Sequence, residues 1–138
     1  MTMTDSSAIP RVFLSFSMVH RPLVELFRHQ AMDRRCGLVL RDYSIKEPIE
    51  GAWKMHAERL IRESSVTICL VGKDTWRSEP VNWEIRKSAE LGKRILAVYL
   101  ESNTVRTPTA LQEVGATYMP WDVEKILDSL YDERRAVS

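Results

Sequence analysis

The stretch TWRSEPVNWEIRKSAELG, Thr75–Gly92, lies between two apolar runs and decides the fold. The preceding run is VTICLV (Val66–Val71), and the following run is ILAVYL (Ile95–Leu100). Such runs are typical of buried strands, and the polar stretch between them fits a turn and a helix. The order strand, helix, strand predicts a crossover between parallel strands. Ligands of open parallel sheets bind where helices begin beyond the carboxyl ends of strands. Glu84, in the second turn of this helix, is therefore a candidate functional residue.

The same alternation of strand and helix continues along the chain. Strands are predicted at Arg11–Phe16, Gly37–Arg41, Val66–Val71, Ile95–Leu100 and Ala116–Met119. Helices are predicted after Pro22, at Trp53–Ile61, after Ser78, at Thr107–Gly115 and at Val123–Leu130. Short links between these elements predict a flavodoxin-like α/β fold, a three-layer sandwich whose five-stranded parallel sheet has helices on both faces.

The chain of 138 residues has the length of one domain. We assign this domain to residues 11–131. Residues 1–10 are polar and are predicted to form a disordered tail, and residues 132–138 are predicted to form a charged tail that frays. The sequence contains neither GxGxxG nor GxxxxGK[ST], so it does not predict a Rossmann dinucleotide site or a P-loop.

The balance of charges limits the partners. The 20 basic and 19 acidic side chains leave a net charge of +1, whereas nucleic-acid binding usually requires a basic excess. Cys36 and Cys69 lack CxxC spacing and do not group with the histidines, so no metal site is predicted and Cys69 is expected to be a buried free thiol. Neither a membrane span nor a signal peptide is recognisable. We therefore expect a cytoplasmic protein without a permanently bound cofactor.

The central helix has a readable start. Ser78 is predicted as its N-cap, with Glu79 and Pro80 as the first two helical residues. Because Pro80 has no N–H, the Ser78 hydroxyl is expected to cap the N–H of Val81. Helical spacing directs Val81, Ile85 and Ala89 into the core and places Glu84 at the edge of this face. A half-buried carboxylate of this kind suits acid–base or electrostatic catalysis.

Each of these residues also has an ordinary structural interpretation. Glu84 can be a solvated glutamate that pairs with Arg86 or Lys87, and Ser78 needs no role beyond capping. Trp53, Trp76 and Trp83 can be core residues or can stack on a base or a nicotinamide ring. Lys73 and Thr75, which follow the third predicted strand, can contact phosphates or simply form a solvated turn.

Four segments carry a resemblance to a known family. FLSFS (Phe13–Ser17), RDYSI (Arg41–Ile45), SSVTICLVGKDT (Ser64–Thr75) and SEPVNWEIRKSAELGKRILAV (Ser78–Val98) resemble TIR-like domains. The resemblance is strongest to the prokaryotic branch that includes the Thoeris antiphage signalling proteins, and it covers about residues 11–100. It implies five parallel strands in the flavodoxin-like order, which agrees with the fold expected from the pattern.

The resemblance also implies a catalytic motif. In many bacterial TIR domains that cleave NAD+, a serine is followed by a tryptophan two residues later and by the catalytic glutamate four residues after that. The serine corresponds to Ser78 and the glutamate to Glu84, but Pro80 occupies the tryptophan position. Trp83 or Trp76 would then have to supply the aromatic surface.

Two other segments are implied to bind substrate. The end of the first strand, Ser15, Phe16 and Ser17, would line the nucleotide pocket, although it can equally be a strand that ends in a polar loop. Asp42, Tyr43 and Ser44 match the start of the family's BB loop, which gates the site and mediates self-association; the loop as a whole is Asp42–Gly51.

The resemblance therefore implies an enzyme that releases nicotinamide from NAD+ and makes an ADP-ribose-derived, cyclic signal for a downstream effector in antiphage defence. The alternative is a non-catalytic TIR-like module that signals by self-association or partner binding. A receiver domain has the same sheet order but needs acidic residues after its first and third strands. Phe16-Ser17 and Gly72-Lys73 occupy those positions, which disfavours a receiver.

Overall fold

A computed structural model describes residues 11–33, 39–42, 52–101 and 105–137. The predicted disordered tail (1–10), Tyr43, Ser44 and most of the Asp42–Gly51 loop lie outside the described residues, as does Cys36. All the predicted strands and helices have counterparts within the described ranges.

Within these ranges, one parallel sheet has the strand order β2-β1-β3-β4-β5, which confirms the flavodoxin-like prediction. Its strands are β1 (Arg11–Ser15), β2 (Val39–Asp42), β3 (Val66–Val71), β4 (Arg94–Tyr99) and β5 (Thr117–Pro120). The helices are α2 (Arg21–Asp33), α3 (Ala52–Glu63), α4 (Glu79–Glu90), α5 (Thr109–Val114) and α6 (Val123–Val137), with two short 3-10 turns, η1 (Met18–His20) and η2 (Thr75–Arg77).

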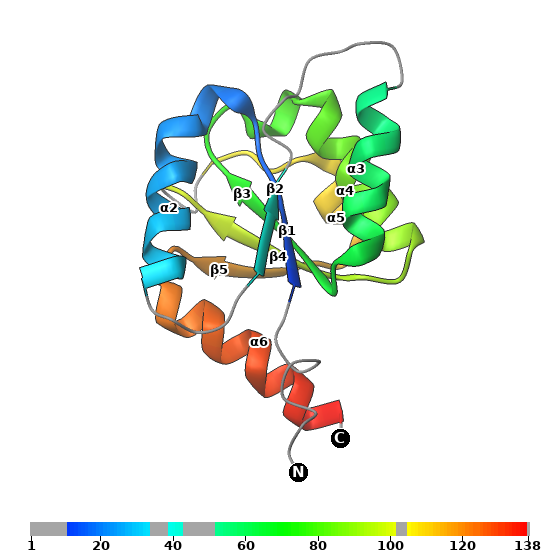
Figure 1. The fold of residues 1–138 in the computed structure, drawn as a ribbon. Coiled ribbons are helices and arrows are strands. Elements are labelled where there is room, and N and C mark those ends of the chain that lie inside the picture. The colour runs from blue at the N-terminus through cyan, green and yellow to red at the C-terminus, as the bar shows by residue number, and fades with distance from the viewer. Residues whose placement is uncertain (1–10, 34–38, 43–51, 102–104, 138) are drawn as a thin grey trace.

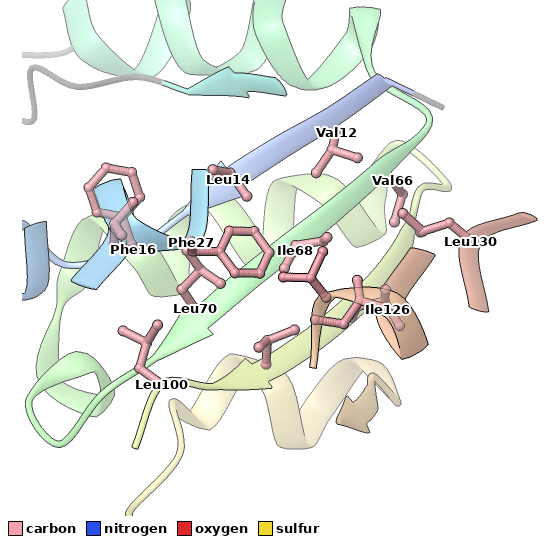
Figure 2. Packing of buried hydrophobic residues seen from close by; sticks show 14 of the residues in the cluster. Val12, Leu14, Phe16, Phe27, Val66, Ile68, Leu70, Leu100, Ile126 and Leu130 are labelled. Carbon is pink, nitrogen blue, oxygen red and sulfur yellow. The ribbon is translucent and has the colours of Figure 1, made fainter. Parts of the chain in front are cut away.

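The helices lie on both faces of the sheet, which completes the predicted three layers (Figure 1). Helices α2 and α6 cover one face, and α3, α4 and α5 cover the other. The α2/α6 face holds the largest apolar cluster (Figure 2), in which alternate residues of β1, β3 and β4 meet both helices. Its labelled members include Leu14, Phe16, Phe27, Ile68, Leu70 and Ile126.

The opposite face is divided into two smaller clusters. Cys69 and Val71 of β3 pack against α4 and α5, and Cys69 is buried and forms no disulfide bond, as predicted. Phe13 of β1 packs against α3 through Trp53 and Ala57. Between these apolar clusters, buried polar side chains from β1, β3 and α4 meet, and they form the candidate site described below.

The structure differs from the sequence-based expectation at the end of the last helix and at Ala89. The last helix, α6, continues through the segment predicted to fray and ends at Val137. The reason is that residues 132–137 contain neither glycine nor proline, so nothing in their backbone stops a helix already started at Val123. Ala89, predicted to face the core, is exposed near the end of α4.

None of the helices described is both long enough and apolar enough to cross a membrane. In the same part of the chain, no group of three or more His, Cys, Asp or Glu side chains is placed to hold a metal ion.

Candidate active site

Helix α4 begins at the carboxyl edge of the sheet as its sequence predicts. The Ser78 hydroxyl accepts a hydrogen bond of 3.2 Å from the backbone N–H of Val81. Pro80 stands in the first turn, where it removes no helical hydrogen bond, and Glu79 adds a negative charge at the positive end of the helix. Ser78 thus fixes where the helix starts and, through the helical repeat, which side chains turn toward β1 and β3.

Glu84 is more deeply buried than its sequence position suggested. The predicted half-buried carboxylate has no exposed surface at all. The Ser15 hydroxyl, from the end of β1, donates a hydrogen bond of 2.7 Å to Glu84 Oε1. A buried carboxylate is costly unless donors stabilise it, and Ser15 is one such donor. Because α4 packs flat on the sheet, the edge of its apolar face is covered as well as the centre.

The surface-pairing interpretation of Glu84 is also wrong. The residues expected as its partners pair elsewhere: Arg86 forms a forked ion pair with Glu113 of α5, and Lys87 pairs with Glu58 and Glu90.

Two more hydroxyls near Glu84, those of Ser88 and Thr67, are hydrogen-bonded to each other. Ser88, one turn further along α4, donates a hydrogen bond of 2.8 Å to the backbone carbonyl of Glu84. A serine hydroxyl has one proton, so the 2.7 Å contact between Ser88 and Thr67 of β3 must be donated by Thr67. All three residues are buried. The backbone of Glu84 is therefore tied to β3 while its side chain is tied to β1.

His20 is a residue at this edge that the sequence reasoning missed. It lies in η1, just beyond β1, and is 8% exposed. Its Nε2 accepts a hydrogen bond of 3.2 Å from the backbone N–H of Asp74, and its ring packs closely against Gly72. Gly72 directly follows β3, so His20 joins the carboxyl ends of β1 and β3. In the sequence, the only signal for this contact was a glycine at the end of a predicted buried strand.

The residues after β3 divide into structural and solvated positions. Thr75 is buried, and its hydroxyl accepts a hydrogen bond of 2.8 Å from the backbone N–H of Gly72, which closes the turn. Because Thr75 is buried, its hydroxyl is not presented to a phosphate. Lys73 is exposed.

The end of β1 does not present all of its predicted residues to the site. Ser15 reaches Glu84, but Phe16 turns to the other face of the sheet, where it belongs to the α2/α6 cluster (Figure 2). Ser17 is partly buried, and its hydroxyl caps η1 by accepting from the N–H of Val19 at 3.4 Å. Asp42 is the last residue of β2 and pairs in register with Leu14, beside the end of β1.

Trp83 precedes Glu84 on α4 and is turned toward α3. Its ring meets the edge of Trp53 from α3 at a centroid distance of 5.3 Å, with Lys54 and Lys87 near it. It lines a hollow of about 510 Å³ across the outer surface of α4, from which Glu84 is absent. Trp76, in η2, stacks instead under the guanidinium of Arg106 at 4.0 Å. The structure therefore places neither tryptophan in contact with the carboxylate.

The candidate site centres on the Glu84 carboxylate, which accepts a hydrogen bond from the Ser15 hydroxyl at the carboxyl edge of a parallel sheet. Such a group can stabilise a positive charge that develops close to it, strongly so because surrounding apolar groups weaken screening. Its complete burial means that a substrate can touch it only if the surrounding elements first move apart.

Comparison with known proteins bears on this site. The sequence matches the family model described as "Thoeris protein ThsB, TIR-like domain" over residues 13–105. Comparison with curated protein sequences gives no match. Among solved structures, the chain is similar to the CMP N-glycosidase BcmB of Clostridium botulinum, with a TM-score of 0.56 and 17% sequence identity. That alignment covers 87% of this chain and 97% of the other, and at this identity it shows the fold alone.

Proposed function

Because the chain belongs to the family of Thoeris ThsB TIR-like domains, we propose that it cleaves the bond between nicotinamide and ribose in NAD+. The observation that carries this proposal is the buried Glu84 carboxylate, held by Ser15 where β1 ends and α4 begins. The similar solved structure, a CMP N-glycosidase, is an enzyme that cleaves an N-glycosidic bond. A substrate with a nucleotide-like ribose is thus consistent with the fold.

The chemistry of this cleavage needs little more than one carboxylate. When the bond between ribose C1′ and the pyridinium nitrogen breaks, its electron pair stays on the nitrogen and nicotinamide leaves as a neutral molecule. The positive charge passes to the ribose, as in glycoside hydrolysis. An ionised Glu84 stabilises this charge or holds the ribose hydroxyls. Neither a general acid for the leaving group nor a metal ion is required.

The product depends on the nucleophile that then bonds to C1′. Water loses a proton and gives ADP-ribose, whereas a nucleophilic group of the same molecule gives a cyclic product. We propose a cyclic, ADP-ribose-derived signal that a downstream effector senses in antiphage defence. The Asp42–Gly51 loop, which lies mostly outside the described residues, is proposed as the self-association segment.

The decisive experiment is incubation of the purified protein with NAD+ at several protein concentrations, followed by mass analysis of the products. We expect nicotinamide release by the wild type and a loss of about 100-fold or more in Glu84→Gln, because one electrostatic group of this type contributes on that order. Glu90→Gln, an exposed glutamate of the same helix, is the matched control and should keep full activity. Full activity of a folded Glu84→Gln variant would refute the site.

One observation favours a second function. Glu84 has no exposed surface, as expected of a carboxylate with a purely structural role in a non-catalytic TIR-like module. Such a module would signal through self-association or through a partner protein. Concentration-dependent association without nicotinamide release in any assembly state would establish this function and exclude the enzyme.

A further inference from the structure

The Ser15 hydroxyl has a specific place in the site. Ser15 is the last residue of β1, which is paired on both sides, with β2 and with β3. Its neighbours Phe13 and Leu14 are apolar and fully buried, and Ser15 is equally buried. A serine at such a position has lost its water and must be hydrogen-bonded inside the protein. Its hydroxyl is directed to Glu84 Oε1.

We infer that Ser15 is a positioning residue for Glu84: it holds the carboxylate ionised and fixes Oε1 at the carboxyl end of β1. This inference rests on the proposed function, which gives Glu84 its catalytic task. A hydroxyl that donates to a carboxylate favours the charged form over the protonated one. The charged form is the one that stabilises a cationic ribose.

The surroundings of Ser15 make this arrangement rigid. The Glu84 side chain is bonded to β1 through Ser15, and its backbone carbonyl is bonded through Ser88, which in turn accepts from Thr67 of β3. The two strands are themselves paired, with Ser15 in register with Cys69. Glu84 is thus attached to one pair of adjacent strands through its side chain and through its backbone, an arrangement that suits precise electrostatic catalysis.

Other titratable groups on the packed elements must be separated from Glu84 in any test. The Cys69 thiol lies beside Ser15 on the same face of the sheet. Glu58 of α3 and Lys87 of α4 form ion pairs at the surface. Helix α5 presents Glu113, which is bound to Arg86. A titration signal that is assigned to the Glu84 carboxyl group therefore separates its ionisation from that of all these groups.

The experiment therefore records the carboxyl carbon-13 signal of Glu84 against pH, assigned by its absence in Glu84→Gln. We expect Ser15→Ala to move the midpoint up by about one pH unit or more, because it removes a hydrogen bond to a charged group. The matched control is Ser64→Ala, which removes another buried serine hydroxyl, donated at 2.8 Å to the Leu60 carbonyl at the opposite end of the sheet. Its midpoint should equal that of the wild type. Equal midpoints in all three proteins would overturn the inference.

Turnover of NAD+ provides the second measurement. We expect Ser15→Ala to lower kcat by about 10-fold or more with little change in KM, since the hydroxyl acts on the carboxylate rather than on substrate binding. Ser15→Cys, a weaker donor of similar size, should be intermediate in both measurements, and it serves the test if the alanine variant does not fold. If Ser15→Ala shifts the Glu84 midpoint but the wild type releases no nicotinamide, the proposed function alone is refuted. An active wild type with unchanged midpoint and kcat in Ser15→Ala would refute the role of Ser15 alone.

Discussion

Gly72 and His20 show how closely two strand ends approach at the candidate site. A Cβ at Gly72 would lie 2.5 Å from both Cε1 and Nε2 of the His20 ring, closer than any real Cβ contact. The glycine is therefore required by close approach and not by an unusual backbone angle, since its φ is not among the positive ones. The ring cannot retreat without losing its hydrogen bond from the Asp74 N–H.

This contact predicts that Gly72→Ala destabilises the fold. We expect a loss of about 1–3 kcal/mol in urea unfolding, the usual cost of forcing an extra carbon into a packed site. A double-mutant cycle with His20→Ala supplies the control, because removing the ring removes the obstruction. The cost of Gly72→Ala should shrink strongly in the His20→Ala background. Two independent, additive costs would show that the ring is not what excludes a side chain at Gly72.

Glu84 shows where sequence reasoning reached its limit for single residues. Its position in the second turn of a helix at the carboxyl edge follows from local pattern, and the structure places it there. Its complete burial does not follow, because burial depends on β1, about seventy residues away in the chain, lying directly opposite it. The hydrogen bond from Ser15 is of the same kind: two polar residues in separate apolar segments, whose meeting only the sheet order determines.

At the scale of whole elements, the amide side chain of Asn82 joins α4 to α5. Asn82 of α4 accepts a hydrogen bond of 2.9 Å from the N–H of Ala110 through Oδ1. Its Nδ2 donates to the carbonyls of Trp76 and Ser78, at 3.3 and 3.0 Å. The cap position of α5 is occupied by Pro108, which provides no side-chain cap. Asn82 therefore acts as the N-cap of α5 from another helix.

We predict that Asn82→Ala destabilises the protein by about 1–2 kcal/mol, the cost of losing a helix cap and leaving backbone groups without their partner. Amide exchange should accelerate first at Ala110 and through α5. Asn82→Asp is the informative companion: its oxygens can still accept from Ala110, but it cannot donate to the two carbonyls. Protection at Ala110 should persist in Asn82→Asp and vanish in Asn82→Ala. Equal loss in both variants would contradict the capping role.

The same two helices are linked at the surface by Arg86 and Glu113. Both nitrogen–oxygen contacts of the fork are short, 3.0 and 3.2 Å, and the side chains are about half exposed. The hydrogen bond from Arg86 lowers the pKa of Glu113 below its ordinary value, and partial desolvation opposes this without reversing it. A lowered pKa in the folded state means that the pair stabilises the fold above the unfolded pKa. That contribution is lost as the pH falls through the folded pKa.

This sign predicts the pH dependence of a Glu113→Gln variant. Its thermal midpoint should lie below that of the wild type near about pH 7, and the gap should close once the pH falls below the folded pKa, where Glu113 is protonated in both states. Because the pair is exposed, the gap should also shrink in about 1 M salt. Glu101→Gln, at another exposed glutamate, is the control. A gap that persists at low pH would mean that glutamine perturbs packing and that the ion pair is not the cause.

Element boundaries followed the sequence wherever a local signal was present. Val66–Val71 forms β3 as predicted, because it is a continuous β-branched and apolar run between polar breaks. Ser78 caps α4 at Val81 because Pro80 leaves the hydroxyl no earlier N–H. Local signals were absent beyond Leu130, and there the predicted end of the last helix was wrong. The position of Trp83 was equally unreadable, since an aromatic residue of a helix can face either an adjacent helix or a ligand.

At the scale of the whole molecule, the two faces of the sheet differ in the side chains that they bury. The face toward α2 and α6 is a continuous apolar cluster (Figure 2). The face toward α3, α4 and α5 interrupts its apolar clusters with the Ser15, Thr67, Glu84 and Ser88 network. Buried polar groups fix geometry at some cost in stability, whereas apolar packing supplies stability without fixing one atom precisely. The site is therefore built on the face where geometry is specified, and the opposite face stabilises it.

Two adjacent residues of β3 test this division, because Thr67 faces α4 and Ile68 faces α2 and α6. Ile68→Val should cost about 0.5–1.5 kcal/mol and leave the Glu84 carboxyl titration unchanged. Thr67→Val keeps the shape but removes the donor to Ser88, at a cost of about 1 kcal/mol. Hydrogen exchange should then accelerate in α4, with α2 and α6 protected as before. If both variants loosened the same helices, the two faces would form one cooperative unit, and the rigidity around Glu84 would have to come from the whole core.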